Sequence, residues 1–306
     1  MRKLLYKLTK KEDGNALVLT ALAMAGMLAM VGLVIDGGHL YMTKSHLQKT
    51  ANATALSGAQ EIPNTQASVN QVVNEVLTAH GEKASLLGEP EVIDDQLEIV
   101  LQKDVPVFFS SIFGVESVPI EAKAKAGLNP LAEAAGAVPL GIDESVELNY
   151  GQPYTLKVDA GDSTSGNFGV LALEGPGAKL YEDTLINGFD ESLKIGDIVN
   201  TQTGNIAGKT SVGVNTRIAN CPYPDGEYQH RDCSRIMLIL VYKPTNPTEN
   251  QMKSVEITGF AYFYLTEPMG KSDDSIKGIF IRRAGSGTSS ENNPPDKGAY
   301  AIKLTE

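Results

Sequence analysis

The chain has 306 residues, a net charge of −11 and no tryptophan, and its length allows about two domains beyond any membrane segment. Within residues 1–14, five lysines and arginines face two acidic residues, so a basic tip precedes a more acidic body. Phosphate binding needs a basic face, which the body lacks, so this charge distribution excludes a nucleic-acid-binding role.

An uncharged run of 20 residues, Ala16–Ile35, follows the basic tip. A helix over this run is about 30 Å long, which matches the hydrocarbon core of a bilayer, and we predict a transmembrane helix over 15–36. The positive-inside rule places residues 1–14 in the cytoplasm and the rest outside the plasma membrane. A cleaved signal peptide is the alternative. Its apolar core is about 7 to 15 residues long and ends at a small-x-small site, so the pattern favours an uncleaved, single-pass anchor.

Asp36 is the first charged residue after the apolar run. A carboxylate at the membrane surface stays hydrated, so Asp36 is predicted to mark the membrane boundary. Apolar and small residues continue at helical spacing to Glu61, and Pro63 ends the pattern. The resulting stalk helix presents a stripe of small residues, which packs either on the protein's own sheet or on another helix. The stripe consists of Ala51, Ala55, Gly58 and Ala59.

Four further elements are predicted before residue 128. Residues 67–84 have the apolar spacing of a second helix that Gly81 stops. Alternating or apolar runs predict strands at 92–102, 105–109 and 118–126. Together with the stalk helix they form a small α+β unit over 37–128.

An ordered pattern runs through residues 12–61. It consists of Gly14 before the apolar span, Asp36-Gly37-Gly38 after it, Leu40-Tyr41, and the Leu-Gln-x-x-Ala-Asn-Ala run of residues 47–61. In this pattern the first quarter of the chain resembles TadG-like proteins of the Tad-type (Flp) pilus-assembly family. The resemblance covers about residues 12–61, and a weaker resemblance to pilin-like strands continues through 105–126. The resemblance implies a pilin-like fold for 37–128 and a role in a pilus or secretion system.

The resemblance also makes Gly14 a candidate processing site. Pilins cleaved by a prepilin peptidase carry a glutamate at the fifth position after the cleavage point, and Leu19 stands there in this chain. This departure favours a membrane-resident accessory component over a major pilin.

Residues 129–141 are rich in Ala, Gly and Pro, which predicts a linker. Beyond it, short apolar runs separated by turn residues predict a β-rich, sandwich- or barrel-like domain over 142–306. The low-complexity stretch 285–298 predicts a mobile loop. The predicted strands of this domain lie at 154–158, 169–173, 236–242, 254–265 and 278–281, with a last edge strand at 299–304.

The two cysteines, Cys221 and Cys233, enclose a short loop. Outside the cytoplasm they are expected to form a disulfide, and two free thiols are the alternative. A zinc site fits less well, because His230 would complete only three ligands.

Motifs for catalysis or cofactor binding are weak. The stretch 161–166 has phosphate-loop glycine spacing but no lysine and Ser/Thr after it, so we reject a nucleotide site. Asp159, Asp162 and Asn167 form an oxygen-rich loop that is either a calcium site or, more commonly, a solvated turn. His39 and His46 are too far apart on one helix to share a metal ion. We therefore assign no catalytic, cofactor-binding or metal-binding residues.

The predicted fold class is α+β: a long transmembrane and stalk helix, a small pilin-like unit and a β-rich C-terminal domain. The predicted function is a non-enzymatic structural or assembly component of a Tad (Flp) pilus or secretion system. Its expected partners are the lipid bilayer, other pilus-assembly or envelope proteins, and itself. The alternative is a membrane-tethered binding protein whose β-domain captures a surface ligand or partner.

Overall fold

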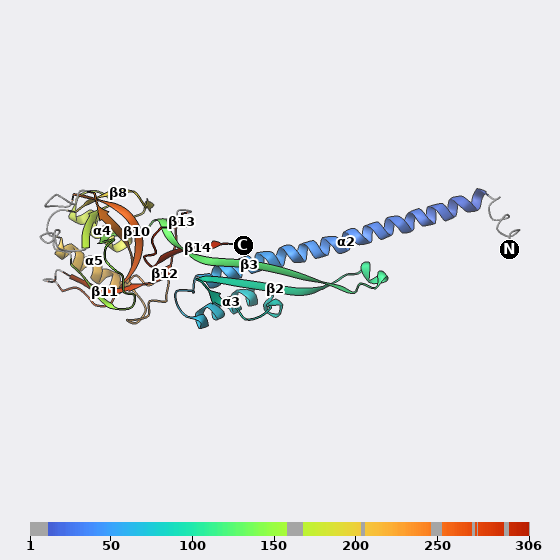
Figure 1. The fold of residues 1–306 in the computed structure, drawn as a ribbon, viewed down its shortest axis with the longest axis horizontal. Coiled ribbons are helices and arrows are strands. Elements are labelled where there is room, and N and C mark those ends of the chain that lie inside the picture. The colour runs from blue at the N-terminus through green and yellow to red at the C-terminus, as the bar shows by residue number, and fades with distance from the viewer. Residues whose placement is uncertain are drawn as a thin grey trace.

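The computed structural model describes residues 12–157, 168–202, 206–245, 253–270, 273, 275–290 and 294–305. These residues form an elongated α+β molecule with one long helix, α2, and two β-sheets (Figure 1). One body, the stalk unit, lies along the C-terminal half of α2. The other, the barrel body, lies beyond the end of that helix.

Helix α2 spans Glu12–Ala59 without a break, 48 residues in all. At 1.5 Å per residue this is about 70 Å. Residues 16–35 are exposed apart from Gly32, and the second half contributes a buried stripe that begins at Leu47. The continuous stalk helix agrees with the sequence prediction to within a few residues at each end.

The stalk unit packs a helix and a long hairpin against the second half of α2. Helix α3 spans Gln66–Ala79, begins at a Thr65 cap whose side chain accepts from the Ser68 amide, and is followed by Gly81 at φ +71°. The helix ends at Ala79 rather than at residue 84, and a short 3-10 turn, η1 (Lys83–Ser85), follows. The remaining elements are β1 (Val92–Ile93), β2 (Gln96–Pro106), η2 (Ser110–Phe113) and β3 (Ser117–Ala134).

The strands differ from the predicted ones at two turns. Asp94 and Asp95 both have positive φ, so the predicted strand 92–102 is split into β1 and β2 by a tight hairpin turn. Strand β2 ends at Pro106, so only the first two residues of the predicted strand 105–109 are strand. Residues 107–109 lead into the turn that connects β2 with β3. The register of β2 and β3 is continuous from Gln96–Gly127 to Pro106–Ser117.

The small-residue stripe of α2 packs on the protein's own sheet. A Cβ at Gly58 would lie 2.5 Å from a methyl carbon of Leu97 and 2.9 Å from one of Val73, so only glycine fits between β2 and α3. The alanines of the stripe are fully buried in the same core. Of the two partners that the sequence left open, the structure shows the chain's own sheet and α3.

The barrel body closes a ring of five strands. Strand β10 (Ser254–Leu265) pairs along one edge with β9 and along the other with β8 and then β11. The ring runs β10, β8, β6, β4, β9 and back to β10, and β11 and β5 extend it. The other strands are β4 (Ala137–Asp143), β5 (Pro153–Lys157), β6 (Phe168–Ala172), β8 (Ile198–Thr201), β9 (Ile236–Pro244) and β11 (Ser275–Ile281).

Two helices of the barrel body were not predicted. Helix α4 (Ala178–Asn187) and helix α5 (Ala207–Asn220) contact each other and bury Tyr181, Leu185 and Val214 in one barrel core. The barrel body has two apolar cores. Residues of β9 and β10 point alternately into the core covered by these helices and into a second core on the other face. Strand β9 is thus buried on both faces, which explains its uninterrupted apolar sequence.

Residues 129–141 are strand rather than linker. They complete β3 and begin β4, with a turn at Ala135–Gly136 where Gly136 has φ +82°. Leu131, Ala134 and Val138 are buried. The apolar residues of this stretch pack in the core. A composition rich in Ala, Gly and Pro, which suggested a linker, does not distinguish a linker from a buried strand.

The C-terminal strand returns to the stalk sheet. Strand β14 (Ala299–Leu304) pairs antiparallel with β3 and parallel with β12 (Arg283–Ala284), so it lies inside the sheet where it meets β12 rather than at an edge. Strands β13 (Thr288–Ser289) and β7 (Leu193–Lys194) also pair with β3. Part of the predicted mobile loop 285–298 is therefore strand, and the expected domain boundaries at 128 and 142 do not follow the sheets.

Candidate functional site

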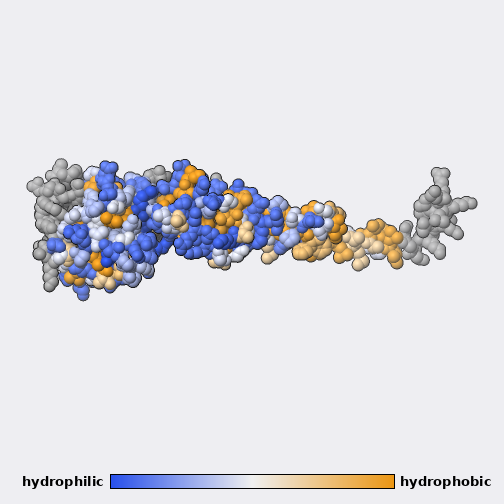
Figure 2. All heavy atoms as spheres, turned by 90° about the horizontal axis from the view of Figure 1, so that it is seen from below, coloured by the Kyte–Doolittle hydropathy of each residue, from blue (hydrophilic) through white to orange (hydrophobic). Residues whose placement is uncertain are grey.

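The first half of α2 carries a continuous apolar surface. Leu17, Leu22 and Val34 are 72%, 66% and 73% exposed. Within the described residues, α2 is the one helix long and apolar enough to cross a membrane. Figure 2 shows this hydrophobic end projecting from a hydrophilic body. The chain thus has one N-terminal helix with the length and composition of a single-pass membrane anchor.

Asp36 lies at the end of the uncharged run and is 3% exposed. Its carboxylate accepts the backbone N–H groups of Phe108, Phe109 and Ser110 at 2.9, 3.0 and 2.7 Å. The Ser110 hydroxyl donates to the same carboxylate at 2.8 Å. Asp36 therefore caps the start of η2 in the way that a helix N-cap residue satisfies free N–H groups. Its predicted place at the membrane boundary remains a prediction.

The hairpin tip, defined as residues 107–116, lies against α2 on the membrane side of Asp36. The Phe109 ring packs on Gly32, where a Cβ would lie 2.5 Å from the ring. The Phe108 ring lies 6.2 Å from the ring of His39. An apolar groove of 330 Å³ separates the rest of the tip from the helix. It is lined by Ala25, Leu28, Ala29, Leu33, Phe109, Ile112 and Phe113.

A buried carboxylate, Glu82, connects α2 with β2 higher on the stalk. It accepts from Lys103 at 2.7 Å and from the Ser85 hydroxyl at 2.5 Å, and lies 3.4 Å from His46. Burial opposes ionisation, but the hydrogen bonds and the charge of Lys103 outweigh it and hold the pKa of Glu82 below its ordinary value. Glu82 therefore carries its charge at neutral pH.

The histidines are distributed rather than clustered. His46 and His80 have ring centroids 6.4 Å apart, and His230 lies 3.2 Å from Glu227 and stacks at 3.7 Å on Tyr223. Within the described ranges, no three His, Cys, Asp or Glu side chains come close enough to hold a metal ion. The calcium candidates Asp159, Asp162 and Asn167 and the glycine stretch 161–166 lie outside the described residues, as do residues 1–11 of the basic tip.

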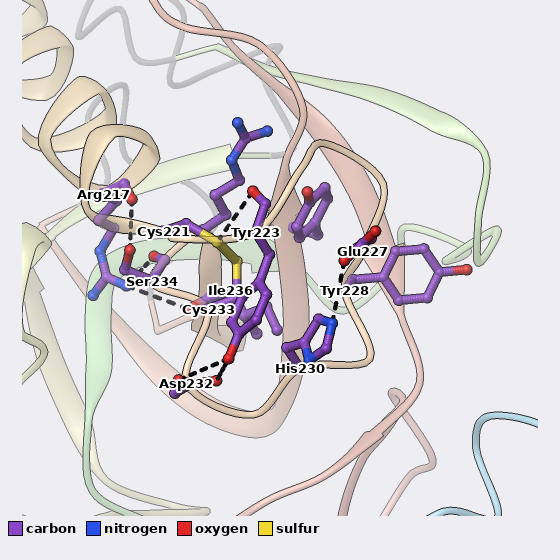
Figure 3. Close-up of a disulfide and its surroundings, with 12 residues drawn as sticks. Arg217, Cys221, Tyr223, Glu227, Tyr228, His230, Asp232, Cys233, Ser234 and Ile236 are labelled. Atoms are coloured by element: carbon purple, nitrogen blue, oxygen red, sulfur yellow. Dashed lines mark hydrogen bonds and ion pairs between the residues drawn. A yellow bond between two sulfur atoms is a disulfide. The ribbon is translucent and has the colours of Figure 1, made fainter. Parts of the chain in front are cut away.

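Cys221 and Cys233 form a disulfide with Cα atoms 4.9 Å apart (Figure 3). It closes the disulfide loop, residues 221–233, between α5 and β9. The Tyr223 hydroxyl lies 2.8 and 3.0 Å from the two carboxylate oxygens of Asp232 across this loop. That hydrogen bond and burial raise the pKa of Tyr223. The disulfide and the hydrogen bond between Tyr223 and Asp232 restrain the conformation of the loop.

Arg217 supports the base of the disulfide loop. It is 7% exposed, and it donates to the carbonyls of Leu185, Ser234 and Ile236 at 2.5, 3.0 and 3.3 Å. Burial lowers the pKa of its guanidinium to about 10. Arg217 remains charged at neutral pH and binds α4 and the start of β9 to α5.

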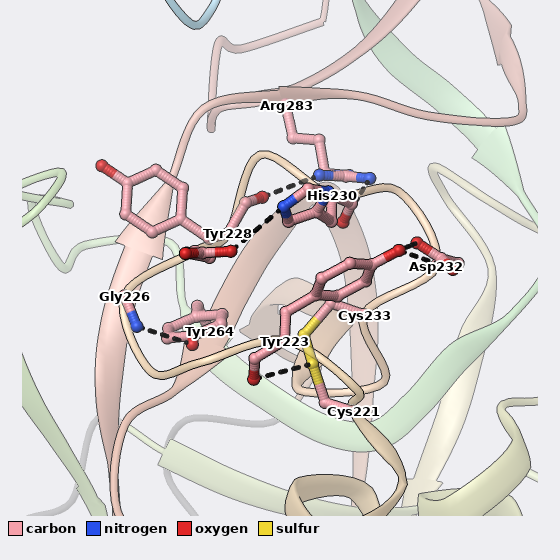
Figure 4. Close-up of polar contacts among 10 residues, drawn as sticks. Cys221, Tyr223, Gly226, Tyr228, His230, Asp232, Cys233, Tyr264 and Arg283 are labelled. Atoms are coloured by element: carbon pink, nitrogen blue, oxygen red, sulfur yellow. Dashed lines mark hydrogen bonds and ion pairs between the residues drawn. A yellow bond between two sulfur atoms is a disulfide. The ribbon is translucent and has the colours of Figure 1, made fainter.

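The disulfide loop contacts the stalk unit through arginines. Arg231 forms an ion pair with Glu61 at 2.9 Å and donates to the side chain of Gln60, just beyond the end of α2. Arg283 donates to the carbonyls of Tyr228 and His230 at 3.0 and 3.4 Å (Figure 4). These contacts define a polar junction between the barrel body and the stalk.

Sequence reasoning placed Gly14, Asp36 and the two cysteines as candidate sites, and the structure places them far apart. Gly14 belongs to the start of α2, Asp36 holds the hairpin tip, and the cysteines lie between α5 and β9 in the barrel body. The sequence did not reveal the partners of Asp36, which are more than 70 residues away. The Phe108-Phe109-Ser110-Ser111 run was a signal, since apolar residues at a hairpin end are unusual.

The fold and these sites define a helix-anchored α+β protein with a stalk and a disulfide-bonded barrel. The family model described as putative Flp pilus-assembly TadE/G-like matches residues 14–61. The chain thus carries a TadE/G-like Tad domain, which coincides with the apolar half of α2 and its buried stripe. No curated protein and no solved structure matches the chain.

Proposed function

We propose that the chain is a membrane-anchored, non-enzymatic structural component of a Tad (Flp) pilus or secretion system. In this proposal residues 1–14 lie in the cytoplasm, α2 crosses the plasma membrane once, and the stalk unit and barrel body lie outside. Pilus-assembly and envelope proteins, and further copies of the chain, are the proposed partners.

The carrying observation is that the matched segment serves two purposes in one helix. Its first half has exposed large apolar side chains such as Leu17 and Val34, and its second half is buried in the stalk core from Leu47 onward. Exposed apolar area on this scale is costly in water and favourable in lipid. The basic tip supports the orientation, because lysine and arginine flank the cytoplasmic end of membrane helices. The disulfide supports an oxidising compartment for the barrel body.

The proposal is tested by replacing Ala23, an exposed residue within the apolar half of α2, by arginine, with Ala23→Leu as the matched control. We expect Ala23→Leu to fractionate with membranes and to restore pilus display, adhesion and secretion to a deletion strain. Ala23→Arg should lose membrane retention and all three activities, since a charge near the bilayer centre costs about 2.5–3.5 kcal/mol.

External protease on spheroplasts should degrade the barrel body and spare residues 1–14. A deletion strain with unchanged pilus display, adhesion and secretion would refute the assembly role. A body protected from external protease would refute the orientation.

Processing at Gly14 is a separate element of the proposal. Leu19 stands where processed pilins carry glutamate, so we expect the mature chain to retain the residues before Asn15. N-terminal sequencing of the membrane-extracted protein checks this. A mature N-terminus at Asn15 would make the chain a processed pilin instead of a resident component.

A further inference from the structure

We infer that the hairpin tip, residues 107–116, inserts into the outer leaflet of the membrane beside α2 and contacts lipid acyl chains. This inference rests on the proposed function, because it requires α2 to cross the bilayer. It adds a second membrane contact that no sequence motif assigns, and its ligand is the hydrocarbon of the surrounding lipid.

The first observation is the composition and exposure of the tip. Phe108, Ile112 and Phe113 are 65%, 78% and 75% exposed, and Val115 is 45% exposed. No charged residue lies between Asp104 and Glu116. Turns that face water favour Gly, Pro, Asn, Asp and Ser. An exposed patch of large apolar side chains therefore marks a surface that something apolar covers.

The second observation is the level of the tip along α2. Phe109 packs on Gly32, and the groove beneath Ile112 and Phe113 reaches back to Ala25. Ala25 precedes Asp36 by eleven positions, which corresponds to about 16 Å along a helix. The contacted part of α2 belongs to the uncharged run, so a tip that touches it shares its depth. The exposed apolar faces of α2 and the tip are continuous across the groove, and Figure 2 shows hydrophobic residues gathered there.

The third observation is that most backbone N–H groups of the tip are hydrogen bonded. In hydrocarbon each unpaired backbone group costs several kcal/mol, so inserted segments must pair them internally. Asp36 accepts three N–H groups of the tip, and the Ser111 hydroxyl donates to the Phe108 carbonyl at 2.6 Å. The N–H groups of Val107, Ile112, Gly114 and Val115 donate to carbonyls of other tip residues. Seven of the ten tip residues thus have their N–H groups bonded, to Asp36 or within the tip, while the apolar side chains of the tip are exposed.

The fourth observation is where charge resumes. Asp104 and Glu116 are exposed at the base of the tip. Farther up, Lys44 of α2 donates to the Glu121 carbonyl of β3. A charged and hydrogen-bonding zone therefore begins directly above the apolar tip, as expected for a segment that enters the hydrocarbon and keeps its flanks in the headgroup layer.

Tryptophan fluorescence tests the inference directly, because the natural chain contains no tryptophan. The tip variants are Phe113→Trp and Ile112→Trp, each in the full chain. Leu28→Trp reports the membrane helix, and Leu87→Trp, at a 54% exposed position in the stalk unit, reports water. Each variant is reconstituted at low protein-to-lipid ratio into phosphatidylcholine vesicles whose acyl chains are plain or brominated.

We expect both tip variants to emit at short wavelength and to lose a fraction of emission to brominated lipid close to that of Leu28→Trp. Leu87→Trp should lose none. Quenching of Leu28→Trp without quenching of either tip variant overturns the inference and leaves the proposed function intact. Short-wavelength tip emission that brominated lipid does not quench also overturns it, because it shows a tip covered by a second copy of the chain. Absence of quenching at Leu28→Trp refutes the membrane anchor itself.

Discussion

The two ends of the stalk are held by opposite chemistry. At the membrane end, the hairpin tip docks on α2 through Phe109 against Gly32 and through a single buried carboxylate, Asp36. At the barrel end, the contacts are the exposed ion pair between Arg231 and Glu61 and the paired strands β3 and β14. We therefore expect the membrane end to be more sensitive to the loss of a single side chain than the barrel end.

The largest effect is expected for Asp36→Leu. Removal of the carboxylate leaves the N–H groups of Phe108, Phe109 and Ser110 without their acceptor, and leaving buried donors unpaired is strongly unfavourable. Each unpaired donor costs about 1–3 kcal/mol, so hydrogen exchange of these amides in the reconstituted full chain should accelerate by more than about a hundredfold. The matched control is Asp36→Asn, which keeps one acceptor oxygen and should accelerate exchange less. Equal protection in the wild type and Asp36→Leu would show that the tip docks without Asp36.

The second effect concerns the disulfide loop in the barrel body. Cys221→Ser combined with Cys233→Ser removes a bridge across a separation of 12 residues. In the chain-entropy model such a short loop contributes about 3 kcal/mol to the stability of the folded state. Thermal unfolding followed by circular dichroism should show a lower midpoint for the barrel body. The membrane end should be unaffected, and hydrogen exchange of the Phe108 and Ser110 amides should match that of the wild type.

A midpoint that does not change in the serine variant would contradict the assigned role of the loop. Treatment of the wild type with a thiol reductant offers an independent check, because Cys221 and Cys233 are the only cysteines in the chain. Reduction should reproduce the serine variant and should have no further effect on it.

The sequence predicted the elements whose patterning is strong and local. Strand β10 spans Ser254–Leu265, as the apolar alternation predicted, and β14 spans the range predicted for the last strand, Ala299–Leu304. The linker at 129–141 was wrong because small apolar residues fit a buried strand as well as a flexible segment. Helix α5, like α4, was not predicted. Helix α5 contains glycines, serine and threonines of low helix propensity, and it is stabilised by packing on the barrel.

The candidate site was only half visible in the sequence. Asp36 stood out as the first charge after an apolar run, but its partners belong to a hairpin 72 to 74 residues later. A carboxylate at a membrane boundary and a carboxylate that caps a distant turn have the same local sequence. Only the tertiary contact between η2 and α2 distinguishes them.

The third effect concerns Glu82 in the middle of the stalk, where a buried charge connects α2 with β2. Glu82→Gln keeps the shape and removes the charge that pairs with Lys103 at 2.7 Å. We expect a loss of about 1 kcal/mol at neutral pH, because the exposed lysine is screened by solvent. Since folding lowers the pKa of Glu82, its contribution is present above the ordinary carboxyl value of about 4.5 and is lost as the pH falls through the lower folded value.

Urea unfolding of the wild type and Glu82→Gln at a series of pH values checks the sign of this dependence. The difference in unfolding free energy should be constant near neutrality and should shrink in acid. Glu98→Gln, at an exposed position of β2, is the matched control and should leave the free energy of unfolding at neutral pH close to that of the wild type. A difference that grows in acid would show that the folded pKa of Glu82 is raised instead.

The smallest effect is expected at the polar junction, and it sharpens the comparison between the two ends. Arg231 is 52% exposed in its pair with Glu61, so Arg231→Ala should cost about 0.2–1 kcal/mol and less at high salt. Lys277→Ala removes a similar exposed pair, with Glu267, that lies within the barrel body. Because β3 and β14 bury side chains in a core that they share with β9 and β10, calorimetry should show one joint unfolding transition for both variants. Two separate transitions in Arg231→Ala alone would show that the Arg231–Glu61 ion pair, and not the shared core, couples the barrel to the stalk.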